Sequence, residues 1–356
     1  MTSDARHCDG PAPLDRADDA ANAIDGPRPA AAAPRPDVYA ALDLGTNNCR
    51  LLIACPEGES FRVIDSFSRI VRLGEGIAAT GRISEAAIGR AISALSVCRD
   101  KMKLRKAQRL RLIATEACRA ASNADAFRDR VETQTGIALE VINRETEASL
   151  AVIGCSPLVD PDGHGAILFD IGGGSSELVR IVRSGNGRQA VPQVDAWMSI
   201  PLGVVTLAER FGGQNVTADI YARMVQEVGK HVAPFAACHG GDLTGMHLLG
   251  TSGTVTTLAG VHLGLPRYDR RRVDGLWMND AEITSAIATL LGMSYQERAA
   301  NNCIGIERAD LVLAGCAILD AIRAAFPVPR LRVADRGLRE GMLVEMMRED
   351  GAIGAA

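Results

Sequence analysis

Two segments of this chain share one pattern: an apolar strand, a short polar loop that opens with Asp and Gly, and a second apolar strand. They read ALDLGTNNCRLLI, with Asp43 and Gly45, and AILFDIGGGSSELV, with Asp170 and Gly172. Self-similarity of this kind indicates a duplicated architecture. The sequence therefore predicts two α/β lobes, each presenting a hairpin tip with an acid and free N–H groups across a cleft.

The second loop places three glycines and two serines where a sheet should be tightest, from Gly172 to Ser176. Each glycine inside a strand costs about 0.5–1 kcal/mol relative to alanine, so the run needs a physical reason. A backbone that must approach a phosphate is one reason, because glycine leaves room for the anion and the serine hydroxyls add donors. A plain tight turn is the alternative.

A third loop lies between a predicted strand and a predicted helix, in the stretch LLGTSGTVTTL (Leu248–Leu258). It places Gly250, Thr251, Ser252 and Gly253 where free N–H groups and the helix dipole would face an anion. One such loop alone is more often a structural turn. Three loops in one chain favour phosphate binding over the turn-only interpretation.

Apolar periodicity predicts alternating strands and helices in the folded part, which begins at Asp37. Capping residues mark helix boundaries at Ser84 and Gly136. Predicted strands lie within 38–55, 109–115, 137–142, 166–179, 196–200, before the third loop and at 331–335. Predicted helices cover about 84–102, 123–136, 146–154, 203–211, from 217, after the third loop, 309–325 and 338–347.

Composition sets the broad class. The first 36 residues contain almost no large apolar side chains and lack the apolar core of a signal peptide, so we interpret them as a disordered tail. The formal net charge of −4 does not support bulk binding of DNA or of an acidic membrane. Nine cysteines without a C-x-x-C pair favour reduced thiols in the cytoplasm over disulfides or a zinc site.

Several stretches, in order, resemble the exopolyphosphatase/guanosine pentaphosphate phosphohydrolase (Ppx/GppA) family of the acetate kinase, sugar kinase, Hsp70 and actin superfold. The resemblance implies two ribonuclease-H-like lobes, at 37–160 and 161–335, with a final helix near 336–350 returning to the first lobe. It indicates the short form without a C-terminal HD-like domain. The stretches are ALDLGTNNCRLLI, IVRLGEGI, ATEACRAASNADAF, INRETEASLAVIG, DIGGGSSEL, IPLGVVTLAERF, GTSGTVTTLA, RADLVLAGCAIL and VADRGLREGML.

The same resemblance implies phosphate-binding roles for residues of the first two loops. In the first loop these are Asp43, Gly45, Thr46 and Asn47; in the second they are Asp170, Gly172, Gly173, Gly174, Ser175 and Ser176. Asn48 and Ser176 replace a serine and a threonine of the family pattern, and both remain polar.

Two further roles follow from the resemblance. Arg119 in TEACRA matches an arginine that faces the phosphate, and Glu147 in TEAS matches the carboxylate that activates water. Thr146 and Ser149 depart from the acid and the arginine that the family has around that glutamate. Without the resemblance, Glu147 would be a solvated residue in the first turn of a helix and Arg119 a surface ion-pair partner. Arg339 and Glu340 in GLREG are interpreted as fixing the last helix.

Attack of water on a phosphoanhydride needs neutralisation of the transferring phosphoryl group and an oriented nucleophile. Glycine-loop N–H groups, Arg119 and Mg²⁺ would supply the first, with Asp43, Asp170 and Glu177 able to hold the metal through oxygen ligands. A carboxylate would take the proton of the water as general base. The six histidines all lie outside the three loops, which disfavours a phosphohistidine intermediate.

These observations predict a cytoplasmic phosphohydrolase that releases terminal phosphate from inorganic polyphosphate or the 5′-phosphate from guanosine pentaphosphate. A small-molecule kinase of the same superfold and a nucleotide-sensing regulatory protein are the alternatives. The expected partners are the substrate and Mg²⁺, with no DNA and no membrane, and a homodimer is left open.

Overall fold

The computed structural model describes residues 37–184 and 191–354. These residues lie in one compact unit. The tail expected at 1–36 lies outside the described residues. Within the described ranges, no helix is long and apolar enough to cross a membrane.

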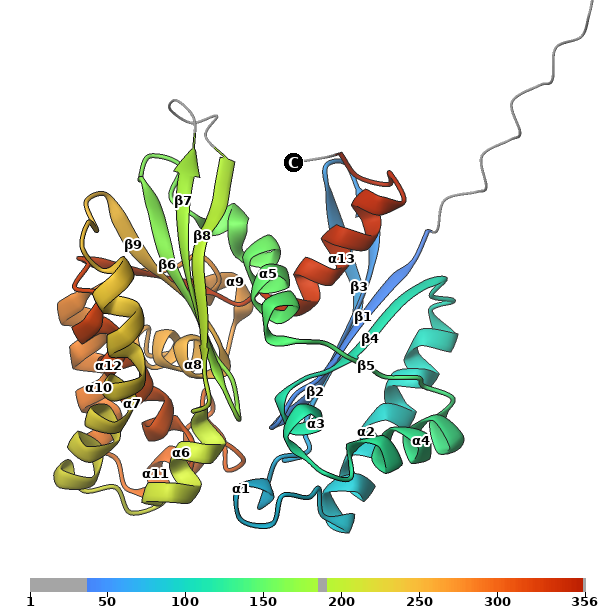
Figure 1. Ribbon diagram of the computed structural model, residues 1–356, viewed down its shortest axis with the longest axis horizontal. Coiled ribbons are helices and arrows are strands. Elements are labelled where there is room, and N and C mark those ends of the chain that lie inside the picture. The colour runs from blue at the N-terminus through green and yellow to red at the C-terminus, as the bar shows by residue number, and fades with distance from the viewer. Residues whose placement is uncertain (1–36, 185–190, 355–356) are drawn as a thin grey trace, which may run out of the picture. The chain divides into compact units, whose positions relative to one another are not determined.

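A first sheet is built from the N-terminal part of the described chain (Figure 1). Its strand order is β3-β2-β1-β4-β5, with β1 to β3 antiparallel and β1, β4 and β5 parallel. Helices α2 (Glu85–Leu104) and α4 (Ala124–Thr135) pack on one face through a core that includes Leu42 and Leu95. The strands are β1 (Tyr39–Leu44), β2 (Asn48–Glu57), β3 (Ser60–Ile70), β4 (Arg109–Ala114) and β5 (Glu140–Val141).

A second sheet of six strands has the order β10-β11-β9-β6-β7-β8. Its larger core, which includes Phe169 and Phe326, packs against most of the later helices. The strands are β6 (Gly165–Ile171), β7 (Ser176–Ser184), β8 (Val191–Ile200), β9 (Met246–Thr251), β10 (Trp277–Asn279) and β11 (Arg330–Ala334). The long helices are α6 (Val204–Phe211), α7 (Ala218–His239), α8 (Gly253–His262), α10 (Asp280–Gly292) and α12 (Val312–Ala325).

The two sheets repeat one topology, which confirms the predicted duplication. Strands β8, β7, β6, β9 and β11 stand in the order of β3, β2, β1, β4 and β5, with the same parallel and antiparallel neighbours. The registers also correspond, because Asp43 lies opposite Arg50 in one hairpin and Asp170 opposite Glu177 in the other. We call the parts built on these sheets the first and the second half.

Two helices, α5 (Arg144–Cys155) and α13 (Leu338–Glu349), lie side by side between the sheets (Figure 1). Helix α13 packs on β1, β2 and β4, whereas α5 packs mainly on the second sheet. Glycines allow the crossing: a Cβ atom on Gly154 would lie 2.0 Å from the carbonyl oxygen of Gly337, and one on Gly341 would lie 1.9 Å from that of Leu150. Neither position can carry a side chain without separating the two helices.

Capping residues in the sequence predicted several helix ends correctly. The Ser84 hydroxyl accepts a hydrogen bond from Ala87 N at the start of α2, and Gly136 ends α4 at φ 71°. The strand expected at 137–142 is only two residues long, and the helix expected from 309 begins at Val312. Helix α10 and several short elements were not predicted, and the short ones are α1 (Ile77–Thr80), α3 (Glu116–Ala120), η1 (Ser156–Leu158), α9 (Arg270–Val273) and α11 (Tyr295–Ala300).

Candidate active site

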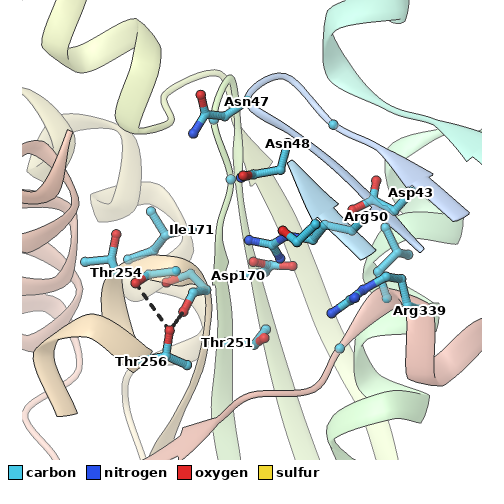
Figure 2. Close-up of a pocket in the computed structure, with 18 of the residues that line it drawn as sticks. Asp43, Asn47, Asn48, Arg50, Asp170, Ile171, Thr251, Thr254, Thr256 and Arg339 are labelled. Carbon is cyan, nitrogen blue, oxygen red and sulfur yellow. Dashed lines mark hydrogen bonds between the residues drawn. The ribbon is translucent and has the colours of Figure 1, made fainter. Parts of the chain in front are cut away.

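The three glycine-containing loops meet at one cavity of about 460 Å³, which both halves line. Figure 2 shows side chains from the hairpin tips, from the end of β9 and from the start of α13 around the same space. Of the residues expected to bind phosphate or to act on water, thirteen line this cavity: Asp43, Gly45, Thr46, Asn47, Glu147, Asp170, Gly172, Gly173, Gly174, Ser175, Thr251, Ser252 and Gly253.

The first loop is fixed by hydrogen bonds that its carbonyl groups accept from the backbone of residues 71–74. Gly74 N donates to Thr46 O at 2.9 Å, and Val71 N and Arg72 N donate to Asn47 O at 2.8 and 3.0 Å. Since the C=O and N–H of a trans peptide point in opposite directions, the Asn47 N–H points away from that supporting segment. It has no acceptor among the described residues, so it remains able to bind an anion.

The second loop is held in the same way by the start of α6. Val204 N donates to Gly172 O at 3.0 Å, and Val205 N donates to Gly173 O at 2.8 Å. The N–H groups of Gly173 and Gly174 therefore point away from α6, and within the described part of the chain neither has an acceptor. Two loops with tethered carbonyls and free N–H groups form a concavity of the kind that can bind an anion.

The glycines of the second loop have a more immediate reason than contact with an anion. A Cβ atom on Gly173 would lie 2.9 Å from Thr46 Cβ and 3.1 Å from Asn47 N, and one on Gly174 would lie 2.9 Å from Thr46 Oγ1. The missing side chains let the two loops touch each other across the halves. The sequence suggested contact with an anion or a plain tight turn as the reason, and this contact was not predicted because it joins residues far apart in the chain.

The third loop caps α8 with Ser252, whose hydroxyl accepts a hydrogen bond from Val255 N at 3.1 Å. The first two N–H groups of this ten-residue helix, at Gly253 and Thr254, remain at the cavity. A Cβ atom on Gly250 would lie 2.5 Å from the ring of Phe169. This glycine allows β9 to pack closely and does not line the cavity.

Three arginines line the cavity without a hydrogen bond or ion pair to any described residue: Arg50, Arg308 and Arg339. A Cβ atom built on Gly253 would lie 3.6 Å from Nη1 of Arg308 and 3.9 Å from Nη2 of Arg50. Guanidinium groups from the two halves thus converge at the start of α8. Unpaired arginines beside free backbone N–H groups favour phosphate as the ligand.

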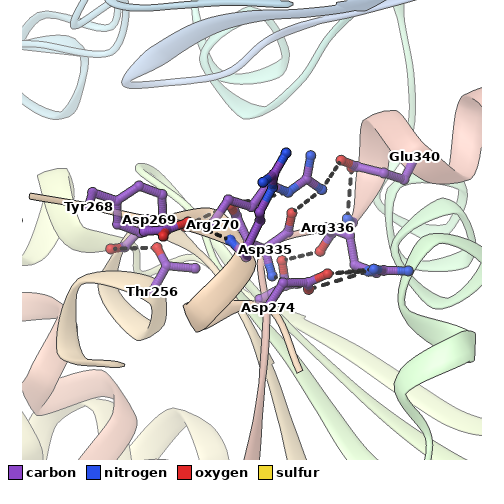
Figure 3. A network of polar contacts seen from close by, with 12 residues as sticks. Thr256, Tyr268, Asp269, Arg270, Asp274, Asp335, Arg336 and Glu340 are labelled. Atoms are coloured by element: carbon purple, nitrogen blue, oxygen red, sulfur yellow. Dashed lines mark hydrogen bonds and ion pairs between the residues drawn. The ribbon is translucent and has the colours of Figure 1, made fainter. Parts of the chain in front are cut away.

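The segment that carries Arg339 into the cavity is fixed by a polar network (Figure 3). The Tyr268 hydroxyl donates to Asp335 Oδ2 at 2.6 Å, and Arg336 forms an ion pair with Asp274. Glu340 accepts from Gly337 N at 3.0 Å and from Arg270 Nη2 at 3.1 Å. The sequence interpretation of GLREG therefore holds for Glu340, whereas Arg339 points into the cavity (Figure 2).

Carboxylates crowd the floor of the cavity. Burial raises the pKa of Asp43, against the charges of Arg50 and Arg339. Burial and the charge of Glu147 raise the pKa of Asp170 to about 7. Buried oxygens without a hydrogen-bond donor occur at Oδ1 of Asp43, Asn47 and Asn48. These oxygens are therefore able to accept hydrogen bonds or to ligate a cation.

Glu147 lies in the first turn of α5, which begins after the capping residue Asn143. Its Oε2 accepts a hydrogen bond from Arg119 Nη2 at 2.8 Å, and Arg119 Nε donates to Glu116 at 3.0 Å. Burial and the charge of Glu177 raise the pKa of Glu147 to about 8, against the opposing charge of Arg119. Arg119 thus holds Glu147 from behind instead of lining the cavity, and Oε1 has no partner among the described residues.

A sequence profile described as the Ppx/GppA phosphatase family matches residues 52–350 of the chain. The chain belongs to this family. The match includes the second and third loops, Glu147 and the arginines Arg308 and Arg339, and it begins just after the first loop. The α/β fold with two ribonuclease-H-like lobes, expected from the resemblance, is confirmed by solved structures of the family.

Relatives of known name or structure cover most of the chain. Exopolyphosphatase 2 of Mycobacterium tuberculosis is 29% identical over 322 residues, which are 86% of this chain and 98% of the relative. A Ppx/GppA family member from Aquifex aeolicus is 30% identical, with a TM-score of 0.72 over 88% of this chain and 99% of the other. An exopolyphosphatase from Cytophaga hutchinsonii shares the fold, with a TM-score of 0.79 at 23% identity over 89% of this chain and all of the other.

The oxygens that line this cavity would suit a magnesium ion that shares its ligands with a substrate. Mg²⁺ is usually bound by one or two carboxylates together with waters and phosphate oxygens. Asp43 and Asp170 line the cavity, the Oδ1 of Asp43 lacks a donor, and both carboxyls have raised pKa values. Within residues 37–184 and 191–354 no three acidic, histidine or cysteine side chains form a complete metal site. Asp43 and Asp170 are therefore the residues that would hold Mg²⁺ if substrate oxygens and waters supplied the remaining ligands.

Four residues expected at the site do not line the cavity: Arg119, Gly250, Ser176 and Glu177. The Ser176 hydroxyl donates to Leu202 O, and the hydroxyls of Ser175 and Ser199 both donate to Glu177 Oε1 at 2.9 Å. Their binding roles stay predictions. Conversely, Arg50 was not predicted as a site residue, although in the first hairpin it occupies the register position that Glu177 occupies in the second.

Proposed function

We propose that this member of the Ppx/GppA phosphatase family hydrolyses the terminal phosphoanhydride of inorganic polyphosphate, with the 5′-phosphate of guanosine pentaphosphate as the second substrate. One observation carries the proposal. Free N–H groups of two loops, three unpaired arginines and a buried glutamate with one free oxygen line the same cavity. Such a cavity can neutralise a phosphoryl group and also accept a proton from water.

In this proposal the loop N–H groups and the arginines bind different parts of the substrate. The N–H groups of Asn47, Gly173 and Gly174 bind the oxygens of the terminal phosphoryl group. Arg50 and Arg308 neutralise the phosphates that follow, and neither arginine has to give up a partner first. Preorganised donors of this kind stabilise the charge of the transition state without reorganisation during the reaction.

Glu147 acts as the general base. Its Oε1 takes a proton from water as the water oxygen forms a bond to the terminal phosphorus, and the bridging P–O bond breaks to release orthophosphate. Arg119 keeps Oε2 occupied and so fixes the orientation of the carboxylate. Asp43 and Asp170 would hold Mg²⁺, which supplies charge neutralisation to the phosphate oxygens when bound.

One assay tests the proposal. Purified protein is incubated with Mg²⁺ and, separately, inorganic polyphosphate, guanosine pentaphosphate and ATP, and orthophosphate release is measured. Rapid release from polyphosphate or guanosine pentaphosphate supports the hydrolase. Tight binding without release would instead favour a nucleotide-sensing protein, and phosphate transfer from ATP to a small molecule would favour a kinase.

A further inference from the structure

A second, smaller cavity of about 220 Å³ lies between the halves, on the other side of the first loop. Asn47 of the first half and Leu311 of the second line both cavities, so the two cavities adjoin. The smaller cavity is bordered by an ion pair between Arg72, which follows β3, and Asp310, which precedes α12. The chemistry assigned to the active site does not use either residue.

The contact between Arg72 and Asp310 is bidentate. Arg72 Nη1 donates to Asp310 Oδ2 at 3.0 Å and Nη2 donates to Oδ1 at 3.1 Å, while Nη2 also donates to Glu307 O at 3.2 Å. The side chains of Arg72 and Asp310 are only 32% and 21% exposed. Paired, partly buried geometry of this kind is stronger than an ordinary surface ion pair.

The backbone of Arg72 is held in an uncommon conformation. Its φ is 46°, and Lys106 is the one other non-glycine residue with positive φ in the part of the chain that the structure describes. A long side chain held in the left-handed region indicates that the surroundings determine the conformation. The surroundings are clear here, since Arg72 N donates to Asn47 O and its guanidinium reaches Asp310.

Both residues of the ion pair, Arg72 and Asp310, are linked through the backbone to active-site residues. At one end, the Arg72 N–H holds the carbonyl of Asn47, whose own N–H has no acceptor among the described residues. At the other end, Asp310 lies two residues after Arg308, whose carbonyl accepts from Leu311 N and Val312 N at the start of α12. The guanidinium of that same Arg308 lies in the cavity.

A second polar contact joins the halves nearby. Gly76 N donates to Glu209 Oε1 of α6 at 3.0 Å. Helix α6 is the element whose first N–H groups hold the carbonyls of the second phosphate loop. Residues 72–76 therefore contact two elements of the second half that position parts of the site. One is the turn before α12 that carries Arg308, and the other is helix α6, which holds the second loop.

We propose that Arg72 is a positioning residue that latches the two halves in the form able to bind substrate. The latch consists of Arg72, Asp310, Gly76 and Glu209, and it brings Asn47 of the first half into register with Arg308 of the second. The inference rests on the proposed function only in taking a phosphate chain as the ligand. Without the latch, the halves spend less time in the closed form, and apparent affinity falls in proportion to the closed fraction.

The test compares Arg72→Ala and Asp310→Asn with wild-type protein on inorganic tripolyphosphate, a short phosphate chain. We expect KM to rise by about five- to tenfold in both variants, with kcat at saturation within about twofold of wild type, because substrate itself closes the halves. The exchange variant with Arg72→Asp and Asp310→Arg should recover most of the lost affinity. Aspartate suits the site, since it tolerates positive φ better than most residues.

Arg210→Ala is the matched control. Arg210 lies next to Glu209 on α6, and its Nη1 donates to Glu227 Oε1 at 2.7 Å inside the second half. Its loss should leave KM unchanged. A latch variant with lower melting temperature and lower kcat but unchanged KM would show a purely structural role and overturn the proposal.

Calorimetric binding of tripolyphosphate without Mg²⁺ gives a readout that needs no turnover. Weaker binding in Arg72→Ala and Asp310→Asn, with recovery in the exchange variant, supports the latch. Equal dissociation constants in all variants overturn it. Wild-type protein that binds tripolyphosphate but releases no phosphate from any substrate would refute the proposed hydrolase, and the same binding comparison would still decide the latch.

Discussion

Gly173 offers the sharpest test of how the two phosphate loops meet. In Gly173→Ala the new Cβ would lie 2.9 Å from Thr46 Cβ, whereas carbon atoms in contact prefer about 3.5–4.0 Å. The loops must therefore separate by about 0.6–1 Å. Thr46 cannot easily yield, because Gly74 N holds its carbonyl and a Cβ on Gly74 would itself lie 2.2 Å from Thr46 Cγ2.

Two effects should follow from this separation. Overpacking of this size typically lowers the free energy of unfolding by about 1–3 kcal/mol. A shift of about 1 Å between the groups that hold the phosphoryl group can lower turnover by about 10²-fold. The expected result is thus a large loss of kcat/KM for phosphate release together with a modest fall in stability measured by denaturant unfolding.

The control is Gly229→Ala in α7, where a Cβ would have no neighbour within 4 Å. It should keep full activity and gain up to about 1 kcal/mol of stability, because alanine favours a helix interior. Near-normal kcat/KM in Gly173→Ala would refute the reasoning, since it would mean that the spacing of the loops does not govern binding or catalysis.

Three other changes have defined outcomes. Glu147→Gln should lower kcat by about 10²–10⁴-fold while tripolyphosphate affinity stays within about threefold, and full activity would exclude a general base there. Hydrogen bonds from Lys101 and Arg105 lower the pKa of Asp65 to about 2, below an unfolded value near 3.9, so its stabilisation is present above pH 4 and is lost as the pH falls toward 2. In Asp65→Asn, urea unfolding should show lower stability at pH 7 and a smaller decline between pH 4 and pH 2, and identical pH curves would contradict this. Deletion of residues 1–36 should leave melting temperature and turnover unchanged, because the segment has little apolar surface to bury; a large drop in either would show that it docks on the fold.

The loops were predictable from sequence because their information is local. Asp43 and Asp170 each end an apolar strand, and the small residues after them leave few alternatives to a tight polar tip. The duplicated sheets follow from the same local pattern. Helix α10 was missed although its start carries a local signal, because Asn279 and Glu282 form a capping box at the start of DAEITSAIATLLG.

The arginines of the site were not predictable in the same way. Arg50, Arg308 and Arg339 occur singly in NNCRLL, IERAD and GLREG, and nothing in these stretches distinguishes them from solvated surface arginines. Only the pairing of β1 with β2 and the return of α13 bring them to one cavity. The contact of Gly173 with Thr46 is hidden for the same reason, since it joins loops more than a hundred residues apart in the chain.

The position of α13 has a consequence for the order in which the protein can fold during synthesis. The face of the first sheet that carries Tyr39, Leu52 and Ile113 is covered by Met342 and Leu343, and the Tyr39 hydroxyl bonds Asp350, 311 residues later. A ribosome releases the N-terminal residues first, so this apolar face stays uncovered until almost the whole chain has emerged. The partly synthesised chain, whose first half has emerged without α13, is therefore the form most prone to aggregation and chaperone binding. A chain that stops before Leu338 would keep this apolar face uncovered.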